Sequence, residues 1–302
     1  MPDGVLILAG ATASGKTELG VELAREFGAE IVGADSRQIY RDMPIGTAAP
    51  SAEQIAAAPH HLIGFLDPAE RYSAARFASD AVDAIADIHR RGKRAIVVGG
   101  TGFYIRTLIG GVELSPQYDE ALRARLAREA LLHSPEFLHH WLGRRDARRA
   151  AQLHVADKYR VLRALEIALG TAQATVAPAQ RRTLASEGMS WMLVFLDVPW
   201  GTVDRRIEQR TDRMLRDGLL DEAERVGGGA VAANAVGYPQ ALSYLRGWST
   251  CAELRSGLDR ATRRYARRQR AWFRGEPATL WLRPETVAQQ VREKLGWSAK
   301  RE

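Results

Sequence analysis

Cysteine is almost absent from this sequence, since Cys251 is the single one among 302 residues. An intramolecular disulfide is therefore excluded, and so is a metal site built from several cysteines. No apolar run approaches the ~18 residues that a membrane-spanning helix needs, so we expect no membrane association. No basic segment with a long apolar stretch precedes the first short apolar run, so we expect no export signal and a cytoplasmic location.

Long polar low-complexity tracts and internal repeats are also missing, whereas hydrophobic residues make up 46% of the chain. This content is sufficient for one large or two smaller hydrophobic cores. The net charge is +7, but residues 123–182 and residues 255–274 each carry +7, which leaves −7 for the remainder. Two basic islands on an otherwise acidic chain predict a docking surface for a polyanion, with solvated arginine-rich helix faces as the alternative.

The most informative stretch is a glycine-rich segment between an apolar run, residues 5–8, and an amphipathic helix predicted to end near residue 27: Gly10, Ala11, Thr12, Ala13, Ser14, Gly15, Lys16, Thr17. This order of strand, loop and helix is the context that a GxxxxGK[ST] pattern requires. Glycines let backbone N–H groups turn toward an anion, and the helix start adds roughly half a positive charge. Lys16 supplies a full charge and the Thr17 hydroxyl can hold a magnesium ion. The pattern predicts a phosphate-binding loop but does not identify the phosphate compound.

Further apolar runs alternate with amphipathic helices, which is typical of a parallel α/β sheet. The predicted strands cover residues 30–34, 94–98, 191–198 and 279–282, and the main predicted helices cover residues 73–91, 201–216 and 253–274. Residues 46–50, which begin with glycine and end with proline, are predicted as a loop.

Between residues 118 and 170 the pattern changes to short helices only. A helical block inserted into an α/β domain is the simplest explanation. The fold class is therefore predicted as α/β, with a P-loop NTPase-like parallel sheet flanked by helices and an inserted all-helical domain. The predicted P-loop core comprises residues 1–115 and 189–302, with a basic C-terminal helix, and the predicted insertion comprises residues 116–188.

Two polar segments follow predicted strands and are expected beside the phosphate loop. Residues 35–38, Asp-Ser-Arg-Gln, follow one strand, and residues 99–104, a second glycine-rich turn, follow another. Because ligands gather at the carboxyl ends of strands in open α/β sheets, we expect Asp35 and the Thr101 hydroxyl in the site. The alternatives are a capping or magnesium-organising Asp35 and a merely tight glycine turn. Residues 60–61, two histidines, are disfavoured as a metal pair because adjacent strand residues point to opposite faces.

Segments spread over essentially the whole chain resemble the bacterial tRNA dimethylallyltransferases, or tRNA isopentenyltransferases, of the IPP transferase family. The matching segments are residues 10–17, 35–40, 46–47, 99–104, 157–166, 206–210, 236–238 and 262–274. The resemblance implies an enzyme, a prenyltransferase that modifies tRNA. It would transfer a dimethylallyl group from dimethylallyl diphosphate to N6 of the adenosine 3′-adjacent to the anticodon, leaving diphosphate. It also implies Mg²⁺ as cofactor, a cytoplasmic monomer, and an insertion that grips the anticodon stem-loop.

The resemblance also assigns roles to individual residues. Asp35, as general base, Thr101 and Lys16 are the expected catalytic residues. Diphosphate binding is expected from Gly10, Ala11, Thr12, Ala13, Ser14, Gly15, Lys16, Thr17, Arg206 and Arg210, with Thr17 as the metal ligand. Contacts with tRNA are expected from Asp35, Ser36, Arg37, Gln38, Thr101, Arg123, Tyr159, Arg160, Val161, Leu162, Arg163 and Arg267.

Three residues depart from the family pattern. Ala11 stands where a proline is usual, which should be harmless, whereas Ala49 and Pro239 stand where the family has a lysine and, commonly, a basic residue. The sequence therefore does not determine whether RNA is contacted at Ala49 and Pro239.

Other functions remain as alternatives at this point. A small-molecule kinase would need a magnesium-organising carboxylate after a central strand, but residues 94–98 are followed by Gly-Gly-Thr, which weakens that interpretation. An enzyme that prenylates free AMP would not need the helical insertion or the basic helix near Arg263. A non-catalytic RNA-binding module that uses a nucleotide as a switch would not need Asp35 and Thr101 to converge on the loop.

Overall fold

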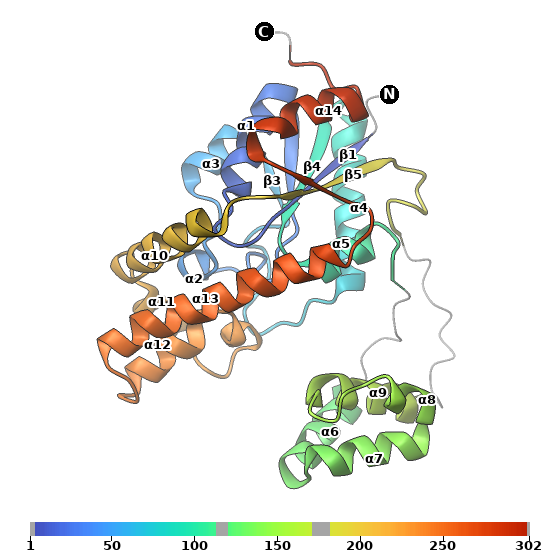
Figure 1. Ribbon diagram of the computed structural model, residues 1–302, viewed down its shortest axis with the longest axis vertical. Helices are drawn as coiled ribbons and strands as arrows, with labels where there is room; N and C mark the ends of the chain where they lie inside the picture. The colour runs from blue at the N-terminus through green and yellow to red at the C-terminus, as the bar shows by residue number, and fades with distance from the viewer. Residues whose placement is uncertain (1–3, 113–119, 171–181, 301–302) are drawn as a thin grey trace. The chain divides into compact units, whose positions relative to one another are not determined.

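The computed structural model of this chain describes residues 4–112, 120–170 and 182–300. Contacts between residues group the chain into a large unit, residues 1–112 with 182–302, and a small unit, residues 113–181 (Figure 1). The small unit ends earlier than the predicted insertion, residues 116–188. Leu184 explains the difference, because it is buried in the core of the large unit and its N–H donates to the Leu108 carbonyl at 2.8 Å.

The large unit contains a six-stranded parallel sheet in the order β3-β2-β4-β1-β5-β6 (Figure 1). Its strands are β1 (Val5–Ala9), β2 (Ala29–Gly33), β3 (His60–His61), β4 (Arg94–Gly99), β5 (Trp191–Leu196) and β6 (Thr279–Leu282). Every residue of β1 and β2 is buried, which explains why β1 is a continuous apolar run and not an alternating one, while β2 carries a single charged residue, Glu30. The predicted parallel α/β sheet is confirmed.

Helices cover both faces of this sheet and extend beyond one of its ends. Those of the large unit are α1 (Lys16–Phe27), α2 (Pro44–Thr47), α3 (Ala52–Ala57), α4 (Ala74–Arg90), α5 (Gly102–Leu108), α10 (Trp200–Arg216), α11 (Leu219–Val226), α12 (Tyr238–Leu245), α13 (Cys251–Arg274) and α14 (Val287–Leu295). Short 3-10 helices span Val231–Asn234 and Pro284–Thr286. Within the described ranges no helix is long and apolar enough to cross a membrane.

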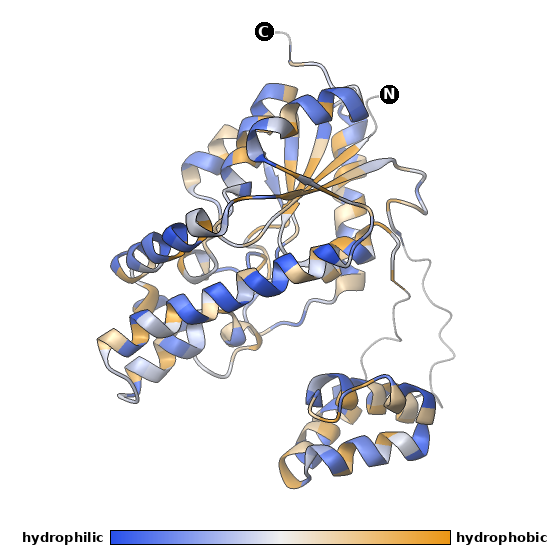
Figure 2. Cartoon of the chain, viewed as in Figure 1, coloured by the Kyte–Doolittle hydropathy of each residue, from blue (hydrophilic) through white to orange (hydrophobic). Residues whose placement is uncertain are grey.

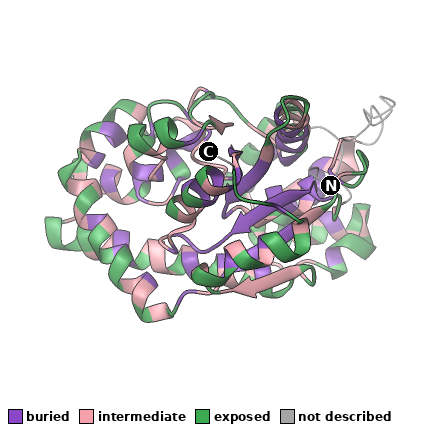
Figure 3. Ribbon diagram, turned by 90° about the horizontal axis from the view of Figure 1, so that it is seen from above, coloured by how far each residue is buried: buried purple, intermediate pink, exposed green. Residues whose placement is uncertain are grey.

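The large unit has two hydrophobic cores. The sheet and its helices form the first, and apolar residues concentrate on the strands while the helices turn polar faces outward (Figures 2 and 3). A second core joins the segment after β2 to α11, α12 and the start of α13, through residues such as Ile39, Met43, Tyr238 and Leu258. This second core holds the segment that carries Asp35 against the helices that follow β5.

Residues 46–50 are not simply a loop, so that prediction is corrected. Gly46 and Thr47 end the one-turn helix α2, and Ala48 follows with φ 46°. A turn of four residues is too short to show a helical period in the sequence. Its N–H groups are satisfied by a carboxylate far along the chain, as described below.

Within residues 120–170 the small unit consists of helices joined by short turns, and it has a core of its own. Its helices are α6 (Glu120–Leu132), α7 (Pro135–Arg145), α8 (Ala147–Ala151) and α9 (Lys158–Gly170). Leu126, Leu138, Leu142 and Leu165 pack together inside it. Ser134 caps α7 by accepting a hydrogen bond from the Phe137 N–H, since the first turn of a helix has no internal acceptors for its N–H groups.

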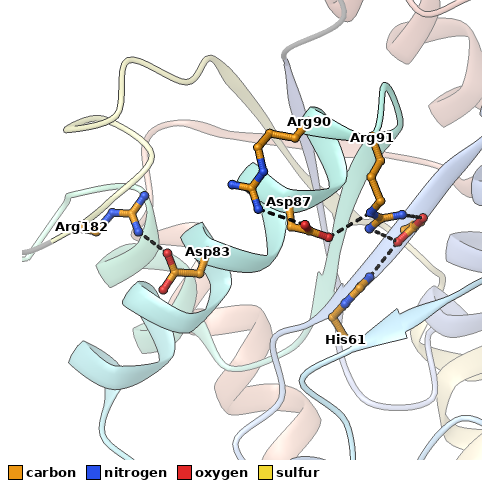
Figure 4. A network of polar contacts seen from close by, with 7 residues as sticks. His61, Asp83, Asp87, Arg90, Arg91 and Arg182 are labelled. Carbon is orange, nitrogen blue, oxygen red and sulfur yellow. Dashed lines mark hydrogen bonds and ion pairs between the residues drawn. The ribbon is translucent and has the colours of Figure 1, made fainter.

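Glu30 of β2 is buried and forms ion pairs with His61 and Arg91, two residues that Figure 4 shows within a wider polar network. The Arg91 guanidinium donates to Glu30, with Nη2 2.8 Å from Oε2, and His61 Nε2 also lies 2.8 Å from Oε2. Hydrogen bonds from Arg91 are the main cause that lowers the pKa of Glu30 to about 2. His60 turns away and contacts the Ala58 carbonyl instead.

Glu30→Gln is expected to lower the free energy of unfolding at pH 7 by about 1–3 kcal/mol. Because the folded pKa of Glu30 lies below the ordinary 4.5, its contribution is complete above pH 4.5 and is lost as pH falls toward about 2. Urea unfolding at several pH values measures this, with Asp87→Asn as the control, since Asp87 pairs with the same Arg91 but is exposed. Equal stability of Glu30→Gln and wild type at pH 7 would contradict the prediction.

Candidate active site

The phosphate loop, Gly10–Thr17, connects β1 to α1 at the carboxyl edge of the sheet. Gly15 has φ 87° and precedes α1, and Ala13 has φ 64°, which costs an L residue about 1 kcal/mol or more. A Cβ on Gly10 would lie 2.5 Å from Ser14 Oγ, so glycine is required there. Ser14 Oγ is buried and has no hydrogen-bond partner within the described residues. An unpaired buried hydroxyl in this loop indicates a place for a polar ligand.

Lys16 and Arg210 concentrate positive charge beside the loop. Burial lowers the pKa of Lys16, and the nearby Arg210 lowers it too, while the Asp35 carboxylate raises it. Burial likewise lowers the pKa of Arg210, and Asp35 again opposes this. Glu18 acts on both cations in the same direction as Asp35 but more weakly, and a bound diphosphate would supply further negative charge beside them.

Two arginines on one face of α10 reach the phosphate loop, as their spacing of four residues allows. Arg206 Nη1 donates to the Ser14 carbonyl at 3.0 Å. Arg210 Nη1 donates to Thr12 Oγ1 at 2.9 Å, and its Nη2 donates to the Thr47 carbonyl at 3.3 Å. The structure thus brings both predicted diphosphate ligands to the loop.

The ends of β2 and β4 meet next to this loop. The Ser36 N–H donates to Thr101 Oγ1 at 3.0 Å, and the Thr101 N–H donates to the Ala34 carbonyl at 3.3 Å. A Cβ on Gly99 would lie 2.1 Å from the Ala34 oxygen, so only glycine permits this approach. The second glycine-rich turn therefore has a structural role, since its close approach to Ala34 places Thr101 next to the segment that carries Asp35.

The Asp35 carboxylate is half-buried and oriented by its own turn. Its Oδ1 accepts the Arg37 N–H at 2.9 Å, whereas its Oδ2 accepts no hydrogen bond from the part of the chain that the structure describes. Asp35 also interacts electrostatically with Lys16, Arg210 and Tyr265. An acceptor oxygen is thus left beside the cationic site, where it can take a proton.

The side chain of Gln38, three residues after Asp35, is held by main-chain carbonyls. Its Nε2 donates to the Thr47 carbonyl at 3.2 Å and to the Ala48 carbonyl at 2.8 Å. The amide oxygen remains as the group that could meet a substrate.

Two residues of α13 belong to the site but were missed in the sequence. Gln269 is buried, and its Oε1 accepts the Thr12 N–H at 2.8 Å while its Nε2 donates to the Gly100 carbonyl at 2.9 Å. Burial, followed by the charge of Asp35, raises the pKa of the Tyr265 hydroxyl, which places this side chain at the same site. Gln269 contacts Thr12 across 257 positions, so no local pattern indicates its role.

Comparisons with known proteins agree on one family. The model of the family described as IPP transferase matches residues 38–276, and that described as isopentenyl transferase matches residues 3–63. The chain is 41% identical over 283 residues to the tRNA dimethylallyltransferase of Geobacter sulfurreducens, covering 92% of this chain and 91% of the relative. It is 42% identical over 298 residues to that of Anaeromyxobacter dehalogenans strain 2CP-C, covering 96% and 99%.

A solved structure agrees as well. The tRNA isopentenylpyrophosphate transferase of Bacillus halodurans superposes with a TM-score of 0.69 at 32% identity, and the match covers 97% of this chain and 96% of that one. The chain belongs to the IPP transferase family. The family resemblance inferred from the sequence motifs is thereby confirmed.

Residues that the IPP transferase resemblance marked as tRNA contacts occupy two environments in the small unit. On α9, Tyr159 is 64% exposed, and Arg160 is exposed as well although it forms an ion pair with Asp157 at 3.2 Å. Val161 is buried in the core of this unit, and Leu162 packs against that core. Arg163 forms an ion pair with the buried Glu166, and Arg123 on α6 is half-buried. Tyr159 and Arg160 are therefore best placed to meet a ligand.

Ion pairs neutralise part of the second basic island, residues 255–274. Arg263 pairs with Asp204 and with Glu208 on α10, the latter at 2.6 Å. Arg255 with Asp212, and Arg270 with Asp197, form two further ion pairs. Arg267 instead lies over the Trp200 ring, 5.2 Å from its centre, and is exposed. The positively charged surface available to a polyanion is therefore smaller than the net charge of residues 255–274 predicts. The reason is that carboxylates of α10 form ion pairs with arginines of α13.

Proposed function

We propose that this chain transfers a dimethylallyl group from dimethylallyl diphosphate to N6 of the adenosine just 3′ of a tRNA anticodon. The carrying observation is that one oxygen of the Asp35 carboxylate, which accepts no hydrogen bond from any described residue, lies beside two cations at the phosphate loop, Lys16 and Arg210. Relatives that share about 41% of their residues with this chain are named tRNA dimethylallyltransferases, which supports the same activity here.

The leaving group determines what the cradle must do. As the N6 nitrogen attacks the allylic carbon, the carbon–oxygen bond breaks and the electron pair leaves with the diphosphate. Lys16, Arg206, Arg210 and the loop N–H groups then stabilise the charge that develops on the leaving oxygens. Such preorganised donors act on the transition state more than on the bound substrate, so they raise the rate of transfer.

A magnesium ion fits this arrangement. Within the described residues no group of three or more His, Cys, Asp or Glu side chains could hold a metal. Mg²⁺ does not need such a cage, because it keeps several waters and is held by few protein oxygens together with substrate phosphates. The Thr17 hydroxyl, in the first turn of α1, would be its protein ligand, with the unpaired Ser14 hydroxyl nearby in sequence. The ion would supply additional charge neutralisation for the diphosphate.

Asp35 is assigned the proton that N6 loses. A carboxylate is far too weak a base to deprotonate a neutral exocyclic amine, whose proton becomes acidic only as the new N–C bond forms. General-base assistance at that stage is worth about 10²–10⁴ in rate. Thr101 holds the Asp35 segment through Ser36, and so contributes by orientation.

The tRNA partner fits the small unit and the segment around Asp35. An adenosine must leave its stack to reach a base and a diphosphate in one site. Splayed loop bases are the usual target of specific RNA recognition, in which aromatic rings and arginines stack or donate. Tyr159 and Arg160 offer that chemistry in the small unit, and Arg267 offers it in the large one.

Incubation with radiolabelled dimethylallyl diphosphate and Mg²⁺ tests the proposal. Label is expected in tRNA, specifically in the adenosine that follows the anticodon, and not in AMP. Transfer to tRNA in which guanosine replaces that adenosine should be absent. Label in AMP would support the free-nucleotide alternative, and ATP turnover without tRNA would support the kinase; either result would contradict the proposal.

A further inference from the structure

Glu222 on α11 is a carboxylate with 0% exposure that lies outside the phosphate loop. Its Oε2 accepts the Ile45 N–H at 2.9 Å, and its Oε1 accepts the Gly46 N–H at 2.7 Å. The Tyr238 hydroxyl donates to the same Oε1 at 2.7 Å. Glu222 has no cationic partner among the residues described, so these donors alone satisfy it. A buried carboxylate is costly unless it is fully hydrogen-bonded, so Glu222 ties its partners to one geometry.

These bonds cap α2 from a distant part of the chain. The first N–H groups of a helix have no internal acceptor, and Met43 at the N-cap of α2 offers no side-chain bond. Pro44 lacks an N–H, so Ile45 and Gly46 carry the two donors that need one, and Glu222 accepts both. A single turn is too short to be stable alone, so the position of α2 depends on this carboxylate.

Tyr238 fixes α2 from the same side. It is completely buried at the start of α12, and its ring lies so close to Gly46 that a Cβ there would be 2.6 Å from a ring carbon. Glycine at this position lets the ring pack directly on the backbone. The Tyr238 hydroxyl then completes the hydrogen bonding of Glu222.

The other end of α2 meets the phosphate loop. The Thr47 carbonyl accepts Arg210 Nη2 at 3.3 Å and Gln38 Nε2 at 3.2 Å. Arg210 in turn donates through Nη1 to Thr12 Oγ1 of the loop. A continuous series of contacts therefore runs from Glu222, through α2, to the guanidinium that faces the phosphate site.

We propose that Glu222 and Tyr238 are positioning residues for the diphosphate site. By fixing α2, they place the Thr47 carbonyl where it holds Arg210 against the phosphate loop and Gln38 beside Asp35. Neither residue touches the substrate. The identity of the ligand as a diphosphate rests on the proposed function, whereas the series of contacts does not.

Isothermal titration with inorganic pyrophosphate and Mg²⁺ tests this without requiring prenyl transfer. Glu222→Gln is expected to weaken pyrophosphate binding about tenfold, because the amide puts a donor where an N–H needs an acceptor. Tyr238→Phe, which keeps the ring, is expected to weaken it about threefold. When Arg210 is already replaced by alanine, the same two changes should weaken pyrophosphate binding by less than about a further twofold. The reason is that they act through Arg210, which is then absent.

Tyr72→Phe is the matched control. It also removes a hydroxyl that donates to a carboxylate, Asp80 at 2.6 Å, but no bond links it to α2. Its pyrophosphate affinity should equal that of wild type. Unchanged affinity in Tyr238→Phe and Glu222→Gln, or effects that add fully to Arg210→Ala, would show a purely structural role and overturn the proposal. If Glu222→Gln does not fold, Tyr238→Phe decides. If the wild-type protein does not transfer the prenyl group to tRNA, the proposed function is refuted. The effects of Glu222→Gln and Tyr238→Phe on pyrophosphate binding can still be measured in that case.

Discussion

Replacing Asp35 with alanine is expected to lower kcat for prenyl transfer to tRNA by about 10²–10⁴-fold. The proton on N6 then has no acceptor beside the new N–C bond. Pyrophosphate affinity is expected to survive or to tighten slightly, because Asp35, ahead of Glu18, is the main carboxylate that offsets the charges of Lys16 and Arg210. Single-turnover transfer of label to tRNA measures the first effect, and isothermal titration with pyrophosphate measures the second.

Asp35→Asn separates proton transfer from orientation. The asparagine carbonyl can still accept the Arg37 N–H that Asp35 Oδ1 accepts at 2.9 Å, so the turn should persist. If Asp35 acts as a base, the asparagine variant should be as slow as the alanine variant. If the asparagine variant transfers label at a rate near that of wild type, Asp35 serves only to shape the turn, and the general-base assignment is wrong.

Replacing Lys16 with methionine is expected to lower kcat/KM by about 10²–10³-fold, the cost of one missing donor to a developing anion. Methionine keeps most of the side-chain volume but removes the charge that faces the loop. Pyrophosphate binding should weaken along with the rate, in contrast to Asp35→Ala, since in the proposed function Lys16 binds the diphosphate both before and during transfer. Steady-state kinetics with tRNA saturating, together with pyrophosphate titration, would show both effects.

Glu18→Gln is the control for Lys16→Met. Glu18 lies two residues further along α1, is exposed, and acts on Lys16 and Arg210 through its charge alone, which raises the pKa of each. Its replacement should leave kcat/KM within about twofold, because exposed charges interact weakly across water. A Lys16→Met variant with kcat/KM similar to this control would place the diphosphate elsewhere than the phosphate loop.

The elements that could be predicted from the sequence are those whose signals are local. Strand β1 is a continuous apolar run because helices cover both faces of the sheet, and the glycine and lysine spacing of residues 10–17 specifies the loop that follows it. The rule that ligands gather at the carboxyl ends of strands placed Asp35 and Thr101 in one site, and the structure brings their segments into contact through Ser36.

Other features depend on contacts between residues that are far apart in the sequence, and local sequence patterns do not reveal such contacts. The one-turn helix α2 was predicted as a loop, because its cap, Glu222, lies 176 positions from Gly46. The basic helix α13 was interpreted as a surface for a polyanion, but Arg255, Arg263 and Arg270 pair with carboxylates from α10 and the end of β5. Net charge counted along a segment ignores such neighbours, so it overstates the positive surface.

The sequence by itself determined the parallel α/β sheet, the phosphate loop and the helical character of residues 120–170. Each follows from apolar periodicity or from a short motif, and both act within a few neighbouring residues. Only the tertiary structure decided that Gln269 joins Thr12 to Gly100, and that Arg210 lies between Thr12 and Thr47. Those contacts join residues far apart in the chain, and a hydrogen bond exists only when packing brings its donor within about 3 Å of its acceptor.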